Sequence, residues 1–559
     1  MTSPLSVGLM RRVMQLPNSL KGLKESGWAW FVCVVVAIGL HAAVSLSIVD
    51  YQQLKPISDE GSYVSLAKSL ALTGQYRSIW LPGEPDHTKY PILFPLVLST
   101  VWKVQSSFPD NIVLFRLLGL LFNVGHLFVL AAVAGRPWKL PPALAAGLIA
   151  LCALHPAFLA CSVNIWSESA YLLFSGLVLL SVYRAEHSSK QNLCLLLAAI
   201  WTVCALYVRL AGLALLGAVA IHFFLRRKWK ELLLFLGMTA VLMLPLVWWS
   251  TVHNPSEQFP EFAFDSSYTT DFQSRLASEG WASVVLTNGI YLFLGVPKAL
   301  VYPFETDLNR LAQFTGWVGL PVWAVLVIGF CRSWRSDYCS ATHYYVLAYM
   351  SLLLVWPYPA GERFLLPMLP IFCTLVLTEA RMLMRASIST ARAGLNAGVK
   401  RLSQVAWAGV LAVWALTFSL HVTAFLAKER VYLKHQEDHS GQMLSSFEWI
   451  SSNSRRQDVV AAYLPTLCYL YTDRKTTPLV FDLTRGLSRP KFVGAALKKH
   501  RVRYLILSKT DFALWTPDVI DKLRKELWQT LWQSSDLALK KVFSTAHGEY
   551  EIYEILWKD

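Results

Sequence analysis

The sequence predicts a polytopic α-helical membrane protein with about 11 transmembrane helices and a small C-terminal α/β domain outside the membrane. Two observations lead to this fold class. Of the 559 residues, 55% are hydrophobic and only 16% are charged, whereas soluble domains carry about 25% charged residues. The missing charge corresponds to apolar blocks of roughly 16 to 25 residues, a length that spans a bilayer.

The apolar blocks define the expected spans. These are 28–49, 111–134, 140–155, 165–183, 192–208, 210–225, 231–252, 311–331, 342–357, 364–380 and 404–427. The first block is too long for a signal-peptide core, so we interpret it as a retained helix. Segment 290–304 is short and contains Gly295, Pro297 and Pro303. It could form a re-entrant or interfacial piece, so we do not count it as a span; if it does span, the topology predicted for the chain after it reverses.

Lys and Arg residues alternate between the loops and predict the topology. They are concentrated in residues 1–27 and in the loops near 136–139, 184–190, 226–230, 332–335 and 381–401. Because positive loops stay in the cytoplasm, the N-terminus is expected there. The outer side then receives loops 50–110, 156–164, 253–310 and 358–363, and everything after 427. This topology accounts for the net charge of +15 better than nucleic-acid binding does, because the basic residues form no single stripe.

The chain divides into three parts: a cytoplasmic N-terminus (1–27), a transmembrane domain (28–427) and an extracytoplasmic domain (428–559). In the last part charged residues become frequent. Short β-like runs occur at 458–463, 467–472, 502–508 and 550–556, and helical stretches at 442–451 and 517–528. Strands that alternate with helices indicate a small α/β domain. Its presence favours a bacterial inner membrane as the location.

The first outer loop contains the most informative motif. Asp59 and Glu60 open a predicted amphipathic helix that ends near Gly74, and Tyr63 lies on its apolar face. Acidic residues in a first helical turn are favoured by the helix dipole alone. The functional interpretation is a general base at the membrane interface. Further along, Lys89 is followed by Tyr90 and Pro91, where a lysine can also simply reach toward lipid headgroups.

Other candidates occupy the ends of later spans on the same predicted side. His155 ends the third span, Glu168 opens the fourth, and Arg209 interrupts the apolar stretch from 193 to 225. Tyr358 and Arg363 precede the tenth span. Each of these residues could serve only as a helix end, but an ionisable side chain at a membrane helix mouth is also a functional candidate.

The order of these motifs resembles the type-C (GT-C) glycosyltransferase superfamily. An acidic pair that opens a surface helix, a tyrosine three positions later and a Lys-x-Pro-x-Leu segment about 30 residues on are most similar to one branch. That branch contains the protein O-mannosyltransferases and the lipid A aminoarabinose transferase. In this chain Tyr90 separates Lys89 from Pro91, whereas in the aminoarabinose branch the lysine directly precedes proline. This difference argues against aminoarabinose as the sugar.

The resemblance implies roles for these residues. Asp59 would be catalytic, with Glu60 beside it. The phosphate of the donor would contact Lys89, Arg363 and Arg209. Substrate-binding residues would be Tyr63, Glu168, His155 and Tyr358. Some relatives use a divalent metal, for which Asp59 and Glu168 are the candidates, and we expect no other cofactor.

The expected activity is therefore a hexosyl- or pentosyltransferase of the cell envelope. It would move a sugar from a polyprenyl-phosphate donor to a hydroxyl of a glycan, lipid or protein acceptor, with inversion and with Asp59 as general base. Two alternatives remain. A flippase or transporter of lipid-linked glycans would predict paired halves with broken helices, which the sequence lacks. A ligase-like transferase of O-antigen would use a diphosphate donor and outer-loop Arg and His.

Overall fold

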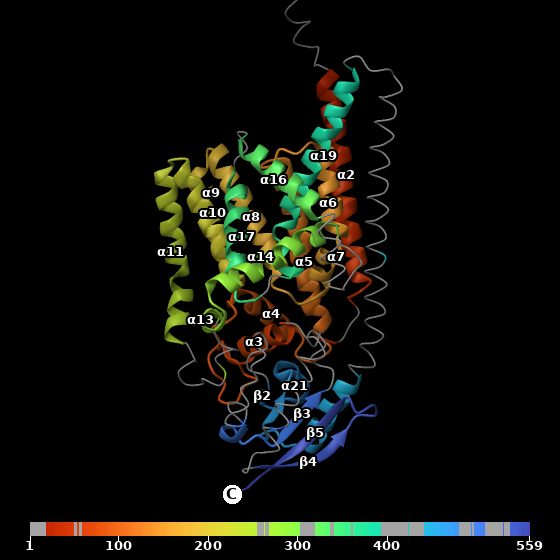
Figure 1. Ribbon diagram of the computed structural model, residues 1–559, viewed down its shortest axis with the longest axis vertical. Coiled ribbons are helices and arrows are strands. Elements are labelled where there is room, and N and C mark those ends of the chain that lie inside the picture. The colour runs from red at the N-terminus through yellow and green to blue at the C-terminus, as the bar shows by residue number, and fades with distance from the viewer. Residues whose placement is uncertain are drawn as a thin grey trace, which may run out of the picture.

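The structure is a computed structural model with a helical bundle and a small sheet at one end (Figure 1). It describes residues 18–49, 53–54, 59–253, 262, 268–301, 319–335, 340–358, 361–392, 423, 441–479, 494, 497–508, 529 and 537–558. The predicted span 404–427, with the exception of residue 423, and the predicted helix 517–528 lie outside this part of the chain.

The bundle is built mainly from long helices in chain order. These are α2 (Asn18–Leu46), α5 (Ile112–Gly135), α6 (Pro142–Leu154), α7 (Pro156–Val163), α8 (Glu168–His187), α9 (Gln191–Val208), α10 (Gly212–Leu225), α11 (Trp229–Val252), α14 (Trp281–Val301), α16 (Leu320–Arg335), α17 (Ala341–Leu354) and α19 (Leu369–Arg392). Shorter helices surround one end: α3 (Glu60–Thr73), α4 (Leu93–Val104), α13 (Tyr268–Glu279) and α18 (Glu362–Leu365).

Within the described residues, five helices are long and apolar enough to cross a membrane, or six if the bent pair α6 and α7 forms one span. They include α11, of which only 17% of the apolar window is buried in the protein. Leu233 on this helix is 70% exposed. An apolar surface of this kind is suited to lipid. The chain is therefore an integral membrane protein, while the count of about 11 spans stays a prediction.

The structure bears on segment 290–304, for which the sequence left open whether it spans the membrane. Its residues up to Val301 continue α14, which starts at Trp281. Its 20-residue window Trp281–Leu300 is long enough to cross. The mean hydropathy of 1.4 over that window includes apolar residues before Ile290, which the shorter segment left out. Pro297 lies inside the helix without ending it.

The bent pair α6 and α7 turns by 54° at His155. A break inside an apolar bundle leaves backbone groups that need partners. Two buried side chains supply partners: His41 Nδ1 pairs with the carbonyl of Ala153 at 2.5 Å, and Asn123 Nδ2 donates to the carbonyl of Phe158 at 2.9 Å. The other ring nitrogen of His41, Nε2, pairs with the Ser162 hydroxyl at 2.8 Å. These contacts join α2 and α5 to the break.

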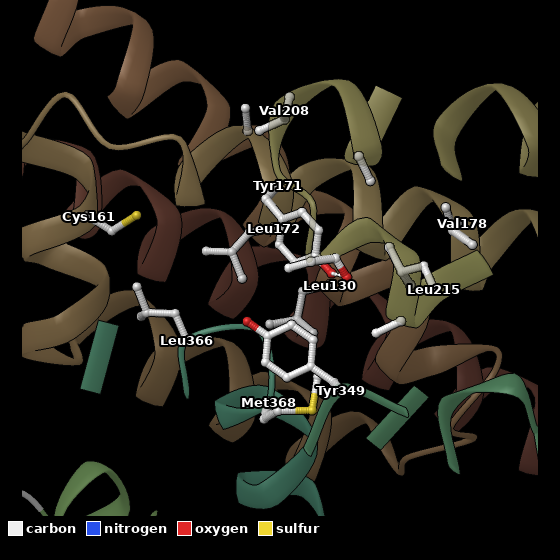
Figure 2. Close-up of a cluster of buried hydrophobic side chains, with 14 of the residues drawn as sticks. Leu130, Cys161, Tyr171, Leu172, Val178, Val208, Leu215, Tyr349, Leu366 and Met368 are labelled. Atoms are coloured by element: carbon white, nitrogen blue, oxygen red, sulfur yellow. Dashed lines mark hydrogen bonds between the residues drawn. The ribbon is translucent and has the colours of Figure 1, made fainter. Parts of the chain in front are cut away.

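The interior of the bundle is close-packed. Figure 2 shows Tyr171 and Leu172 of α8 beside Tyr349 of α17, with Leu366 and Met368 from the segment that follows α18. Tyr171 and Tyr349 are both fully buried, and their ring centroids lie 6.4 Å apart. Rigid packing of this kind fixes the helix ends above it.

The C-terminal segment forms a five-stranded sheet in the order β2-β1-β3-β5-β4. The strands are β1 (Val460–Ala462), β2 (Thr476–Pro478), β3 (Tyr504–Ser508), β4 (Leu537–Ser544) and β5 (Tyr550–Trp557). β1 runs parallel to β2 and β3, and β5 is antiparallel to β3 and β4. Residues 441–453 are helical. The domain boundary at 428 stays a prediction.

The β-like run 467–472 is a correction, because it forms the helix α21 (Pro465–Thr472). Its aromatic and apolar residues suggested a strand. However, Pro465 at the first helical position is well placed to start a helix. Leu467, Leu470 and Cys468 are buried at helical spacing. The sheet and α21 lie at the end of the bundle next to α3 and α4 (Figure 1).

Candidate active site

A cavity of about 340 Å³ lies at the end of the bundle that faces α3. It is formed by residues that are far apart in the sequence. Its lining comes from the start of α3, the loop before α4, the turn between α9 and α10, Tyr268 of α13, the end of α17 and the start of α18: Asp59, Tyr63, Lys89, Tyr90, Pro91, Val208, Arg209, Leu210, Ala211, Tyr268, Tyr349, Leu352, Leu353, Trp356, Tyr358, Arg363 and Phe364.

Asp59 is the residue immediately before α3, but its side chain makes no capping hydrogen bond to that helix. Its carboxylate instead faces the cavity. Oδ1 accepts a hydrogen bond from the Tyr90 hydroxyl at 2.9 Å, and Oδ2 accepts one from Arg363 Nη2 at 2.8 Å. About a third of the side chain (34%) stays exposed. A residue that served only to cap α3 would direct its oxygens at the helix N–H groups.

Two arginines meet at one buried glutamate beside Asp59. Glu168 Oε1 accepts from Arg209 Nη1 at 2.7 Å and also from Arg363 Nε. Arg209 also donates to Ser167 Oγ at 2.9 Å. The Glu168 side chain is 2% exposed, and its Oε2 has no hydrogen-bond partner among the described residues. Arg363 therefore links Asp59 to Glu168 through one guanidinium.

The electrostatics keep Asp59 ionised. Burial by itself raises the pKa of this carboxyl. The ion pair and hydrogen bond from Arg363 and the hydrogen bond from Tyr90 outweigh it, so the pKa is lowered from its ordinary value. The opposite applies to His87 in the same loop: its burial, with help from Lys89, lowers the imidazole pKa to about 3 and keeps the ring neutral.

Lys89 approaches the cavity from the loop before α4. Its Nζ donates to the Tyr358 hydroxyl at 3.4 Å and lies 5.4 Å from the ring centroid of Tyr268. Lys89, Arg209 and Arg363 give three positive charges and Asp59 and Glu168 two negative ones, so this group carries a formal charge of +1. A site of this kind is suited to an anionic ligand.

Most of the predicted residues meet here, but two do not. The Glu60 side chain is fully buried and accepts a hydrogen bond from the Ile165 backbone N–H at 3.2 Å, away from the cavity. His155 starts α7, and its Nε2 pairs with the carbonyl of Ala299 at 2.8 Å. Neither residue lines the cavity. Their contacts are those of residues that join helices.

Five lining aromatic residues were missed by the sequence analysis as site residues: Tyr90, Tyr268, Tyr349, Trp356 and Phe364. Tyr90 was noticed only as a departure from the family pattern, yet its hydroxyl contacts Asp59. Tyr268 and Trp356 had no signal, because each stands in a segment without a recognisable motif. Their rings lie 5.7 Å apart, and Tyr268 also lies edge-on to Tyr90 at 6.1 Å. Adjacent rings provide a stacking surface for the apolar face of a ligand.

The residues do not fit the divalent metal that was considered for Asp59 and Glu168. The described part of the chain holds no group of three or more His, Cys, Asp or Glu side chains that could bind a metal ion. The Arg363 guanidinium bridges the two carboxylates, and it already supplies the positive charge that a metal would bring. We derive no step through a metal.

A second cavity of about 420 Å³ lies near the other end of α17, between that helix, α16, α19 and the start of α6. We call it the far cavity. Its charged residues are Lys139, Arg332, Glu379 and Arg381. Residues 340–346 of the chain line the far cavity, whereas Tyr349 and the two residues Leu352 and Leu353 line the cavity at Asp59.

Comparison with known proteins identifies the fold. No family model and no curated protein matches the sequence. Among solved structures, ArnT from Cupriavidus metallidurans bound to undecaprenyl phosphate matches with a TM-score of 0.55 and 14% identity, over 94% of this chain and 98% of that chain. AglB, an oligosaccharyltransferase from Archaeoglobus fulgidus in complex with an inhibitory peptide and a dolichol-phosphate, matches with a TM-score of 0.53 and 12% identity, over 93% and 74%. The chain has the fold that these two structures share.

Proposed function

We propose that this chain, which has the fold of the type-C glycosyltransferases, transfers a sugar from a polyprenyl monophosphate to a hydroxyl of an acceptor. The observation that carries the proposal is the carboxylate of Asp59 in one cavity with Lys89, Arg209 and Arg363. A base next to phosphate-binding cations is what such a transfer needs. The similar structures support the donor class, because ArnT was bound to undecaprenyl phosphate and AglB to a dolichol-phosphate.

The reaction is a single displacement. The acceptor oxygen forms a bond to the anomeric carbon while the bond from that carbon to the phosphate oxygen breaks. The bonding electron pair leaves on the phosphate, and the acceptor proton moves to Asp59. The products are an inverted glycoside and the polyprenyl phosphate. Because Asp59 keeps a lowered pKa, it is ionised at neutral pH. It takes the proton late, as the acceptor oxygen gives electron density to the anomeric carbon and its proton becomes more acidic.

The cations have the complementary task. The donor phosphodiester carries one negative charge and the departing phosphate gains another. Arg363 and Arg209 lie within one linked set of charges around Glu168. Lys89 approaches from the opposite loop. Groups that are already oriented stabilise the developing charge without reorganising during the step. A guanidinium can also hold two phosphate oxygens at once.

The aromatic lining suits the sugar and the end of the lipid. Tyr63, Tyr90 and Tyr268 surround the cavity next to Asp59, and ring faces stack against the C–H face of a sugar. We propose that α13, which lies in the part of the predicted loop 253–310 before α14, and the C-terminal segment bind or gate the acceptor, a glycan, a lipid or a protein. The reaction would take place on the outer face of a bacterial inner membrane.

The first experiment compares two lipids. Thermal unfolding of the detergent-purified protein is measured with a long-chain polyprenyl monophosphate and with the diphosphate. A ligand that binds only the folded state raises the melting temperature with concentration. We expect the monophosphate to give the larger rise. A rise that is specific to the diphosphate would favour the ligase-like alternative, and no rise with either would reject the donor.

Variants connect this binding to the cavity. Lys89→Ala and Arg363→Ala should weaken the rise, whereas Lys103→Ala, on the exposed end of α4, serves as the matched control. Asp59→Asn keeps the side-chain size and should keep donor binding while it abolishes transfer. Full transfer by Asp59→Asn would remove the base role. Translocation of intact donor without transfer in the unaltered protein would support the flippase alternative.

A further inference from the structure

The loop that holds Asp59 and Lys89 is in direct contact with the C-terminal segment. The contact has two parts, one at each end of the loop. The first joins α21 to the start of α3, and the second joins β2 to the loop before α4. Each part lies within a few residues of a group that the proposed reaction uses, which is why the two contacts matter for chemistry as well as for stability.

The first contact is at Gly61, two residues after Asp59. A Cβ at Gly61 would meet Thr466 Oγ1 at 2.5 Å and Leu467 Cδ1 at 2.7 Å. Separations below 3.0 Å do not occur for real Cβ atoms, so the first turn of α3 lies directly on α21. A larger side chain at this position would have to displace the side chains of Thr466 and Leu467, or move the first turn of α3, and Asp59 with it, away from Arg363.

The second contact adds hydrogen bonds to the edge of the sheet. The Thr476 N–H donates to the carbonyl of Trp80 at 2.7 Å, and Lys475 Nζ donates to the carbonyl of Ile79 at 2.5 Å. Lys475 also pairs with Glu84. Trp80 is 2% exposed. The loop is therefore joined to the start of β2 by one backbone hydrogen bond and by the side chain of Lys475.

A relay of hydrogen bonds leads from this loop to the carboxylate. His87 N–H donates to the carbonyl of Tyr76 at 3.0 Å, and the His87 Nε2 accepts the Tyr90 N–H at 3.1 Å. Tyr76 hydroxyl donates to the carbonyl of Tyr90 at 2.8 Å. The Tyr90 hydroxyl then donates to Asp59. The backbone of Tyr90 is therefore held on both sides, its ring stacks on His87 with centroids 5.4 Å apart, and Lys89 precedes it in the chain.

We propose that Thr466, Leu467, Lys475 and Thr476 form a positioning clamp that holds Asp59, Tyr90 and Lys89 in working geometry. The inference rests on the proposed function and deepens it: the C-terminal segment completes the active site. The α21 part sets the backbone of Asp59, and the β2 part sets Tyr90 and Lys89. Transfer tolerates little displacement of its reacting groups, and about 1 Å can cost about a hundredfold in rate.

The α21 part is tested with a steric change and its suppressor. Gly61→Ala should lower kcat about tenfold to a hundredfold while the melting-temperature rise given by the polyprenyl monophosphate persists. Adding Thr466→Ala removes the nearest atom and should restore a large part of the rate. Gly217→Ala is the control, because no atom lies within 4 Å of a Cβ there. A wild-type rate for Gly61→Ala, or a loss that Thr466→Ala leaves unchanged, overturns this part.

The β2 part is tested through the pH profile. In Lys475→Gln the hydrogen bond from Tyr90 to Asp59 loosens, so the acidic limb of kcat should move to higher pH, and Lys475→Arg should restore it. A substitution that only destabilised the sheet would lower the rate equally at every pH. An unmoved limb in Lys475→Gln therefore overturns this part.

A measurement without turnover separates failure of the clamp from failure of the proposed function. Amide hydrogen exchange in residues 59–92 is compared between the unaltered protein and Lys475→Gln. Faster exchange in the variant supports the clamp even if no donor binds and no transfer is found. Unchanged exchange overturns the clamp even if the transferase activity is real.

Discussion

The two cavities at opposite ends of α17 differ in a way that reveals what marks a site in this fold. The far cavity is larger, about 420 Å³ against 340 Å³, and it also holds three cations and a carboxylate. Its ion pair between Arg332 and Glu379 has a length of 2.7 Å, but the Arg332 side chain is 53% exposed. At the other end Arg363 is 23% exposed and contacts two carboxylates. The two cavities therefore differ in how their charged side chains are linked and buried. Cavity volume does not predict this difference.

The largest expected effect is on the rate of sugar transfer. It tests whether the cavity at Asp59, and not the far cavity, carries out the reaction. Asp59→Asn should lower kcat by about 10²- to 10⁴-fold, the usual contribution of a general base. The matched change in the far cavity, Glu379→Gln, should leave transfer unchanged, because its carboxylate pairs with Arg332 and lies at the other end of α17 from Asp59. An equal loss in both variants would show that the comparison is wrong.

The free energy of unfolding should also respond differently to the loss of an arginine from each of the two cavities. Arg363→Ala leaves Glu168 and Asp59 without a shared cation, and the loss of one partner from a buried ion pair costs about 3–5 kcal/mol. Arg332→Ala removes a pair in which the arginine is 53% exposed but Glu379 is only 7% exposed, so we expect a smaller cost of about 1–3 kcal/mol. Denaturant unfolding in detergent measures both. Similar costs for the two variants would mean that burial of the charges does not separate the cavities.

Donor affinity should show a smaller change. Lys89→Ala removes a cation that lies near Tyr358 and Tyr268, and a hydrogen bond to a charged group contributes about 1.5–3 kcal/mol. We therefore expect about a tenfold or somewhat larger rise in the Kd of the monophosphate. Titration of the lipid against intrinsic fluorescence gives this constant. Lys139→Ala in the far cavity should not change it.

The smallest expected effect is a shift of the pH profile, and it tests the lowered pKa of Asp59. Tyr90→Phe removes one hydrogen bond that keeps the pKa of this carboxyl low. The pKa should rise, so the ionised base is lost at a higher pH and the acidic limb of kcat moves up by at most about one pH unit. Because the folded pKa is the lowered one, the stability that the Asp59 contacts contribute is complete at neutral pH. That stability is lost as the pH falls through the folded pKa. A limb that moves down would contradict the assignment.

The charged residues that line the cavity at Asp59 could be predicted from the sequence, but the residues that they contact could not. Asp59, Lys89, Arg209 and Arg363 were found because charged side chains at the ends of apolar runs are few and therefore visible. The structure brings all four to one cavity. Glu60 was included only because it is next to Asp59, but successive residues of a helix start point in different directions, and its carboxylate meets the Ile165 N–H.

Long-range pairings left no signal in a single sequence. Nothing in residues 268 or 356 indicates that their rings would meet beside Lys89, since aromatic residues are common throughout this chain. Gly61 and Thr466 are in contact although they are about 400 residues apart in the sequence. Helix α21 was also missed, although for a local reason. The β-like composition after Pro465 outweighed this proline as a signal for a helix start.

The hydrogen bonds of His41 also bear on how the chain is assembled. Its partners Ala153 and Ser162 are 112 and 121 residues later in the sequence. At a synthesis rate of about 5–20 residues per second, roughly 5 to 25 seconds pass before both exist. During that interval α2 holds an imidazole without these partners in an otherwise apolar segment. Release of α2 into the lipid before α6 and α7 exist would leave this imidazole without the partners that the folded bundle gives it, and an unpaired polar group in hydrocarbon costs free energy.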